Sequence, residues 1–236
     1  MRVTMRDLLF TNYAVPQAIV RPLVPDLFEI ETLSTEDGQD CAVVSAVPFR
    51  VVDFVSSSLP FSSLRFNQIN YRTHVRSEGA PAVYFFEMRL NSRMITAGAS
   101  FMRLPLRYEE LELEVRDSGA GQESDGANRS FRWAGPEGLD IDFEIGEDAA
   151  APDLLIDAEF LTKRPTGFIS TATGTIFKIE VEHERMRTLP ARINRARIPF
   201  LESLGSLGEG VRVPPRSALY VEEIIFHAHQ PARWRD

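Results

Sequence analysis

The chain has 236 residues of ordinary globular composition, 44% hydrophobic and 25% charged, with a net charge of -8. This acidic balance argues against a general nucleic-acid or anionic-membrane binder, because both partners require a basic face. The one cysteine, Cys41, excludes an internal disulfide and a thiolate metal cluster. Cys41 lies in an apolar run (CAVVSAV), which predicts a buried structural thiol rather than a nucleophile.

The sequence predicts neither a targeting segment nor a membrane span. No run approaches the ~20 apolar residues that a membrane helix needs. The N-terminal residues MRVTMRDLLFTNY lack the apolar region of a signal peptide. We therefore expect a cytoplasmic protein with a single domain over residues 1–236 and no membrane or nucleic-acid partner.

The first half of the chain is predicted to consist mainly of strands. A short helix is expected at residues 16–22, which are enclosed by prolines, and a strand-like region follows at 24–33. Residues 41–55 are rich in valine and predict one or two strands interrupted near Pro48. Further strands are predicted from apolar runs bounded by turns, at residues 66–75, 82–90 and 95–104.

The second half continues this pattern, with one longer helix. Loops are predicted from composition at residues 118–128 and 147–152. Strands are predicted at residues 109–117, twice within 130–145 around Gly135-Pro136, at 175–182 and at 218–229. A helix is expected at 191–204, kinked or split by Pro199. The whole favours a mainly β (α+β) fold, an antiparallel barrel or sandwich with a few short helices.

The strand predicted at residues 66–75 carries a line of polar side chains. Because side chains alternate along a strand, Gln68, Asn70, Arg72 and His74 share one face. This line either faces a polar cavity or forms a solvated outer surface, and both alternatives stay open. Within a cavity, Arg72 would be the natural carboxylate clamp, because its planar guanidinium donates two parallel hydrogen bonds to a carboxylate.

Small residues interrupt the strand predicted at 95–104. The run Ala97-Gly98-Ala99-Ser100 leaves space against one sheet face. It predicts either the floor of a pocket or close packing against a bulky neighbour such as Phe85 or Phe86.

Two histidines near the C-terminus raise the question of a metal. His227 and His229 are two residues apart on a predicted strand and so face the same way. A metal site needs a third ligand, for which His183 and Glu223 are candidates, and nothing in the sequence places them nearby. Phosphate-binding glycine loops, zinc-type spacings and nucleophile elbows are absent from the sequence. We therefore expect no metal and no cofactor.

Lysine chemistry has two candidate residues, Lys163 and Lys178. Lys178 alternates with glutamates, which is typical of a solvated charged face. Lys163 is followed by Arg164, a like charge that would lower its pKa and could activate it for imine formation if both groups were desolvated. The solvated alternative is preferred for both lysines.

Several segments in order resemble the YqjF-like uncharacterised family of the acetoacetate decarboxylase-like superfamily. They are LLFTNYAVPQAIVRPLVPD, NYRTHV followed by GAPAVYFFEM, ITAGASFMRLPLRY, FLTKRPTGF and VEHERMR. The resemblance spans most of the chain and rests on the order of loose motifs. It implies a closed, cone-shaped antiparallel β-barrel with a central cavity and short peripheral helices, and it suggests a homo-oligomer.

The decarboxylases of this superfamily use a buried lysine as an imine-forming nucleophile, with a second lysine beside it. Carried over around Gly98 and Pro105, this pair falls on Leu106 and Arg107, and an acid of the family falls near Gln68. Leucine cannot form an imine, and an arginine stays protonated. The resemblance therefore implies the barrel and its cavity without the lysine-dependent mechanism.

Three hypotheses of function follow. The first is a protein that binds a small, mostly apolar carbonyl or carboxylate compound through Gln68, Asn70, Arg72 and His74. The second is an enzyme of the lyase or hydrolase type on a small keto or carboxylic acid, with His74 or Glu87 as acid or base. The third is a structural or interaction protein with a vestigial cavity.

Overall fold

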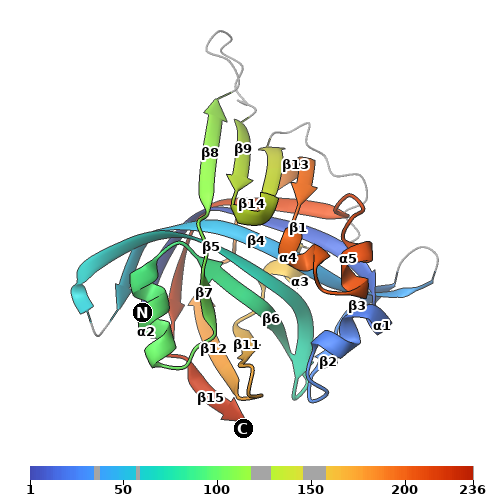
Figure 1. Ribbon diagram of the computed structural model, residues 1–236, viewed down its shortest axis with the longest axis horizontal. Helices are drawn as coiled ribbons and strands as arrows, with labels where there is room; N and C mark the ends of the chain where they lie inside the picture. The colour runs from blue at the N-terminus through green and yellow to red at the C-terminus, as the bar shows by residue number, and fades with distance from the viewer. Residues whose placement is uncertain (35–37, 57–58, 118–128, 146–157, 236) are drawn as a thin grey trace.

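The computed structural model describes residues 1–34, 38–56, 59–117, 129–145 and 158–235. The loops predicted at 118–128 and 147–152 lie outside these ranges. Strands dominate the described chain, as predicted (Figure 1). Within the described ranges, no helix has the length and apolar character needed to cross a membrane.

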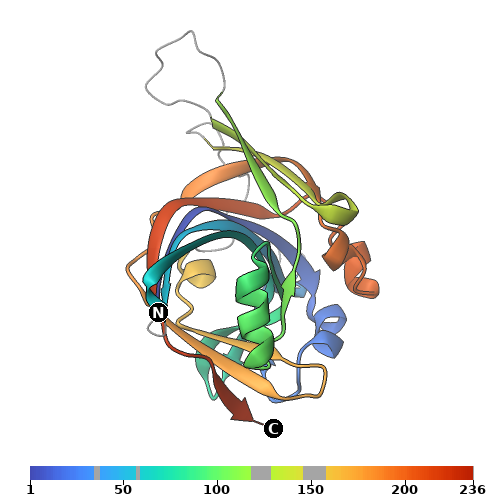
Figure 2. The ribbon, with the colours of Figure 1, turned by 60° about the vertical axis from the view of Figure 1, so that its left-hand side comes forward.

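Long strands pair into a ring, seen in Figure 2. In order of pairing they are β12 (Ile176–His183), β11 (Thr166–Ser170), β6 (Ala80–Leu90), β5 (Leu59–Ser77), β4 (Asp40–Ser56), β1 (Arg2–Pro16) and β14 (Ser217–Ala228). β14 pairs in turn with β12, through Val181↔Ala228 and its neighbours. The prediction of antiparallel pairing is wrong at one place in the ring, because β11 runs parallel to β6.

Shorter elements surround the ring. A sheet extension projects from β14 (Figure 1) and contains β13 (Leu189–Arg197), β10 (Asp140–Ile145), β9 (Arg129–Ala134) and β8 (Glu112–Asp117). The short strands are β2 (Glu29–Ile30), β3 (Thr32–Ser34), β7 (Leu106–Tyr108) and β15 (Ala232–Arg235). The helices are α1 (Gln17–Val20), α2 (Arg93–Phe101), α3 (Ala158–Thr162), α4 (Pro199–Glu202) and α5 (Ser206–Gly210), with 3-10 turns at Arg21–Leu23 and Pro136–Gly138.

Side-chain alternation along the ring strands divides the core into two parts. One face of β5, containing Ile69, Tyr71 and Val75, packs into a large cluster with α1, α4 and the sheet extension. The opposite faces of β1 and β4 form a second cluster with Leu161 of α3. In Figure 2, α3 (yellow) lies inside the ring, so this second cluster is the interior one.

The strand predicted at residues 95–104 is wrong, because most of this segment forms α2. The Ser92 hydroxyl caps the helix by accepting a hydrogen bond from the Ile95 amide at 3.4 Å. The run Ala97-Gly98-Ala99-Ser100 lacks the β-branched residues that fit a pleated surface. Ala99 alone of the four is buried, in a cluster with Phe85 and Met88 of β6.

The helix predicted at residues 191–204 is also wrong over most of its length. Residues Leu189–Arg197 form β13 and pair with β10, where Ile193 lies opposite Phe143. Pro199 begins the short α4 and does not kink a longer helix, since proline is favoured at the first helical position. The partner strand, which no local pattern reveals, overrides the helical appearance of this segment.

Candidate functional site

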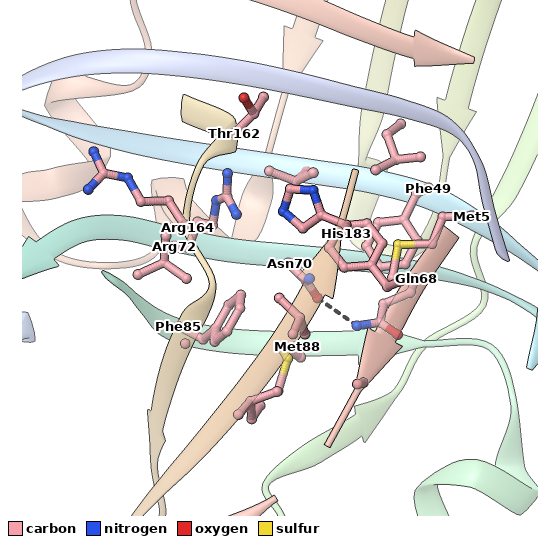
Figure 3. A pocket seen from close by; sticks show the side chains of 18 of the residues that line it. Met5, Phe49, Gln68, Asn70, Arg72, Phe85, Met88, Thr162, Arg164 and His183 are labelled. Carbon is pink, nitrogen blue, oxygen red and sulfur yellow. Dashed lines mark hydrogen bonds between the residues drawn. The ribbon is translucent and has the colours of Figure 1, made fainter. Parts of the chain in front are cut away.

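A cavity of about 240 Å3 opens on the face of β5 that contains Arg72 (Figure 3). Its volume lies just below the ~300–1,000 Å3 typical of pockets for drug-sized ligands, so it suits a smaller molecule. The lining is mainly apolar, from Met5, Leu8, Phe10, Val47, Phe49, Val83, Phe85, Met88, Leu104, Leu106, Ile179, Val181, Met186 and Phe226.

Three of the four side chains in the predicted polar line belong to this lining. Gln68, Asn70 and Arg72 follow one another along the cavity wall in Figure 3. They therefore face the cavity and not an outer surface. A bulge in β6 helps to shape the wall beside them, because Phe86 is an extra residue between the pairs Tyr71↔Glu87 and Arg72↔Phe85.

Arg72 has no carboxylate partner among the described residues. Its Nη2 donates a hydrogen bond to the Leu161 carbonyl of α3 at 2.9 Å. Its Nε is buried without an acceptor, and the guanidinium lies 5.2 Å from the centroid of the Phe10 ring. Burial, and less strongly the nearby Arg164, lower the pKa of Arg72 to about 9. The guanidinium remains charged at neutral pH and has no counter-ion in the described part of the chain.

A second arginine, Arg164, joins the lining from the residues that follow α3. Its Nε donates to the Phe160 carbonyl at 2.7 Å, and its Nη1 lies 2.5 Å from Glu31 Oε2 in an ion pair. Burial lowers the pKa of Arg164, and Glu31 opposes this shift. Glu31 also lies 3.1 Å from Nε of Arg76, whose side chain is 42% exposed. Glu31 thus pairs with Arg164 and with Arg76, and not with Arg72.

His74, the fourth residue of the line, is fully buried but does not line the cavity. Its ring stacks on Phe160 of α3, with the ring centroids 4.7 Å apart. Neither ring nitrogen has a hydrogen-bond partner in the described chain. Burial, followed by Arg72 and Arg164, holds the pKa of His74 well below its usual value, so the imidazole is neutral.

The neutral state of His74 predicts a specific loss of stability in acid. Below pH ~6.5 the unfolded chain takes up a proton at His74 while the folded chain does not. The free energy of unfolding therefore decreases as the pH is lowered. The contribution is up to about 1.4 kcal/mol per pH unit. Urea denaturation across this range is expected to show a smaller acid slope for His74→Leu than for the wild type. His229→Ala, at an exposed histidine, serves as control, and equal slopes for all three proteins would refute the assignment.

Glu87, the other predicted acid or base, lies away from the cavity lining. It is buried and forms ion pairs with Arg89 and with Arg107, the latter at 3.1 Å between Nε and Oε2. Arg89 also pairs with Glu109. Glu87 is therefore part of an ionic network on the opposite face of β6, and its catalytic role stays a prediction.

The two positions onto which the resemblance carries the lysine pair, Leu106 and Arg107, separate in the structure. Leu106 lines the cavity, whereas the side chain of Arg107 is 71% exposed and pairs with Glu87. The two lysines of the chain do not line the cavity either. Lys163 is exposed, and Lys178 Nζ lies 2.7 Å from Glu180 Oε1.

Arg164, Glu31 and His183 belong to the site but were not predicted as ligand-binding residues. The only local signal for Arg164 was its place in a Lys-Arg-Pro run, which is typical of an exposed segment. His183 lines the cavity, and its Nδ1 lies 2.7 Å from the Glu184 carbonyl. Of the proposed histidine pair, His229 lies 3.2 Å from Glu182. The described residues contain no group of three or more potential metal ligands.

Gly167 packs directly against the ring of Phe85 in the cavity wall. A Cβ atom there would overlap the ring of Phe85, and both residues line the cavity. Gly167→Ala is expected to displace this ring and to cost about 1–2 kcal/mol of unfolding free energy by overpacking. Thermal denaturation would measure the loss. The matched control is Gly98→Ala in α2, where an added Cβ meets nothing within 4 Å; a loss as large as that of Gly167→Ala would contradict the argument.

Several solved structures of other proteins share this fold. The enduracididine biosynthesis enzyme MppR in complex with pyruvate aligns with a TM-score of 0.62 at 12% identity, over 98% of this chain and 89% of that one. An acetoacetate decarboxylase-like enzyme of Sphingomonas wittichii RW1 has a TM-score of 0.61 at 13% identity, over 99% and 92%. The acetoacetate decarboxylase of Legionella pneumophila has 0.54 at 14%, over 98% and 87%. The chain therefore has an acetoacetate decarboxylase-like fold.

The sequence defines the family. The model of DUF2071, described as an uncharacterized conserved protein, matches residues 2–223. The chain is also 34% identical over 117 residues to the uncharacterized protein YqjF of Bacillus subtilis (strain 168). That match covers 48% of this chain and 46% of YqjF. The chain belongs to the DUF2071 family, and the predicted resemblance is confirmed.

Proposed function

We propose that the ring of strands forms a closed barrel that binds a small monocarboxylic acid with a mostly apolar body. The observation that supports this most is Arg72, a half-buried arginine that lines the cavity with a buried, unpaired Nε and without a carboxylate among the described residues. Burying an unpaired charge is unfavourable, and an anionic ligand would supply the missing counter-ion. The apolar lining would accommodate the rest of the molecule.

The charges beside the cavity favour one negative charge on the ligand. Of the residues that line the cavity, Arg72 and Arg164 carry positive charges, and Glu31 neutralises that of Arg164 while it also contacts the partly exposed Arg76 outside the lining. A monocarboxylate balances the remainder, whereas a dicarboxylate would bring a second charge into an apolar space. The planar guanidinium of Arg72 can donate two parallel hydrogen bonds to a carboxylate.

Calorimetric titration with butanoate, hexanoate and octanoate would test the proposal, with hexanol and hexylammonium as controls. At least one of the acids is expected to bind, and at about 100 times its Kd to add about 2.7 kcal/mol to the free energy of unfolding. The alcohol and the ammonium ion are expected not to bind. If none of the acids bound, or if hexanol bound as tightly as hexanoate, carboxylate recognition by Arg72 would be wrong.

The alternative is an enzyme of the lyase or hydrolase type on a small keto or carboxylic acid. It draws support from solved enzymes of this fold, one of them complexed with pyruvate. A mechanism without an imine fits the positions of Lys163 and Lys178 away from the cavity lining. Borohydride treatment with a panel of keto acids tests this point: covalent capture at either lysine would show that the protein forms an imine.

The assembly of the protein into a homo-oligomer stays a prediction.

A further inference from the structure

The cavity has a second polar region, separated along its wall from the two arginines. Figure 3 shows Gln68 and Asn70 on one side and Arg72 and Arg164 on the other. Asn70 is two residues from Arg72 along β5 and Gln68 is four, which corresponds to about 7 and 13 Å between Cα atoms. Apolar side chains, including Met88, line the space beside this strand.

The two amides have hydrogen-bonding capacity that the protein leaves unused. Gln68 Nε2 donates to Asn70 Oδ1 at 2.7 Å. Asn70 Nδ2 then retains two N–H donors and Gln68 Oε1 retains its acceptor positions, without partners in the described part of the chain. Both side chains are half-buried and reach the cavity. A ligand that fills the cavity would remove water from them, and polar groups cut off from water need hydrogen-bond partners, so the amides favour a ligand group that completes their bonds.

In Figure 3 the imidazole of His183 lies near this amide pair, whereas the guanidiniums of Arg72 and Arg164 lie farther along the wall. No carboxylate is labelled beside the pair, so an ammonium group would lack a counter-ion there. An uncharged group that both accepts and donates, such as a hydroxyl or a primary amide, matches Asn70 Nδ2 and Gln68 Oε1 together.

We propose that the ligand is bifunctional, with a carboxylate at Arg72 and an uncharged hydroxyl or amide group at Asn70 and Gln68, joined by a short apolar chain. This inference rests on the proposed function and narrows its ligand class. The amide pair is then the residue set that determines specificity, because an analogue without the polar group leaves buried donors and acceptors unpaired.

The experiment compares butanoate, hexanoate and octanoate, each with and without a terminal hydroxyl, by calorimetric titration. The wild type is expected to bind at least one hydroxylated acid about tenfold more tightly than its plain counterpart. Asn70→Leu and Gln68→Leu replace each amide by an apolar side chain of similar size. In both variants this preference is expected to fall to roughly threefold or less, while the plain acid binds as well as before or better. Retained binding of the plain acid shows that the variants are folded.

The outcomes separate the two proposals. Binding of plain acids that depends on Arg72, without a preference for the hydroxyl in the wild type, overturns the bifunctional ligand and leaves carboxylate binding intact. A preference that persists unchanged in both leucine variants also overturns it, because the hydroxyl would then bind elsewhere. If no acid binds to the wild type, both proposals fall. A preference lost in both variants establishes the amide pair as the second recognition point.

Discussion

Arg72→Met is expected to reduce the affinity for a monocarboxylate roughly 100-fold, because it removes the charged guanidinium that would donate two hydrogen bonds to the carboxylate in an apolar cavity. The same substitution is expected to leave the fold as stable as before, or about 1 kcal/mol more stable. It removes a half-buried charge that has no counter-ion among the described residues, and this gain offsets the lost hydrogen bond to the Leu161 carbonyl. Most substitutions of buried residues destabilise, so this combination is diagnostic of a binding group.

Calorimetric titration and urea denaturation of the same preparations would measure the two effects. Arg65→Met is a suitable control, since Arg65 is an exposed arginine on the same strand. It is expected to change neither the affinity nor the stability. A large loss of stability in Arg72→Met would indicate instead that the arginine is structural, with its bond to α3 as its main role.

Glu31→Gln is expected to lower the free energy of unfolding by about 3 kcal/mol, the largest loss of stability expected from these variants. Glu31 is the ion-pair partner of Arg164, whose side chain is 4% exposed, and also contacts Arg76. The substitution keeps the shape of the side chain and removes its charge, so a second guanidinium beside the cavity loses its counter-ion.

The charge preference of the cavity is expected to change at the same time. With Glu31 neutral, the excess of positive charge rises from one to two, so Glu31→Gln should bind the dicarboxylate adipate better relative to hexanoate. Chemical denaturation with and without these acids measures both effects. Glu29→Gln, at an exposed glutamate two residues earlier, is the control. Unchanged stability of Glu31→Gln would show that solvent already compensates Arg164.

Most of the strands could be predicted from local patterns. The valine-rich β4, the alternating β12 and the two strands around Gly135-Pro136 all correspond to predicted strands. The secondary structure of residues 95–104 and 191–204 was predicted wrongly, because the prediction depended on local residue propensities alone. A serine cap and the lack of a partner strand make the first a helix, whereas pairing with β10 makes the second a strand.

The residues of the candidate site were also predicted only in part from the sequence. Alternation along β5 placed Gln68, Asn70 and Arg72 together correctly, because a period of two is a property of any extended strand. It also placed His74 with them, but Phe160 of α3 covers that ring. α3 follows β5 by about eighty residues in the chain, and no local pattern reveals where it packs.

Residue patterns alone were enough to predict the strand-rich class, the family and the shared face of three polar residues. These depend on residue identity and on local backbone geometry. The folded chain was needed to show that this face lines a cavity, that α3 lies inside the ring and that Glu31 pairs with Arg164 but not with Arg72. Burial and charge compensation arise from contacts between segments distant in sequence, so the lack of a counter-ion for Arg72 among the described residues is visible only after folding.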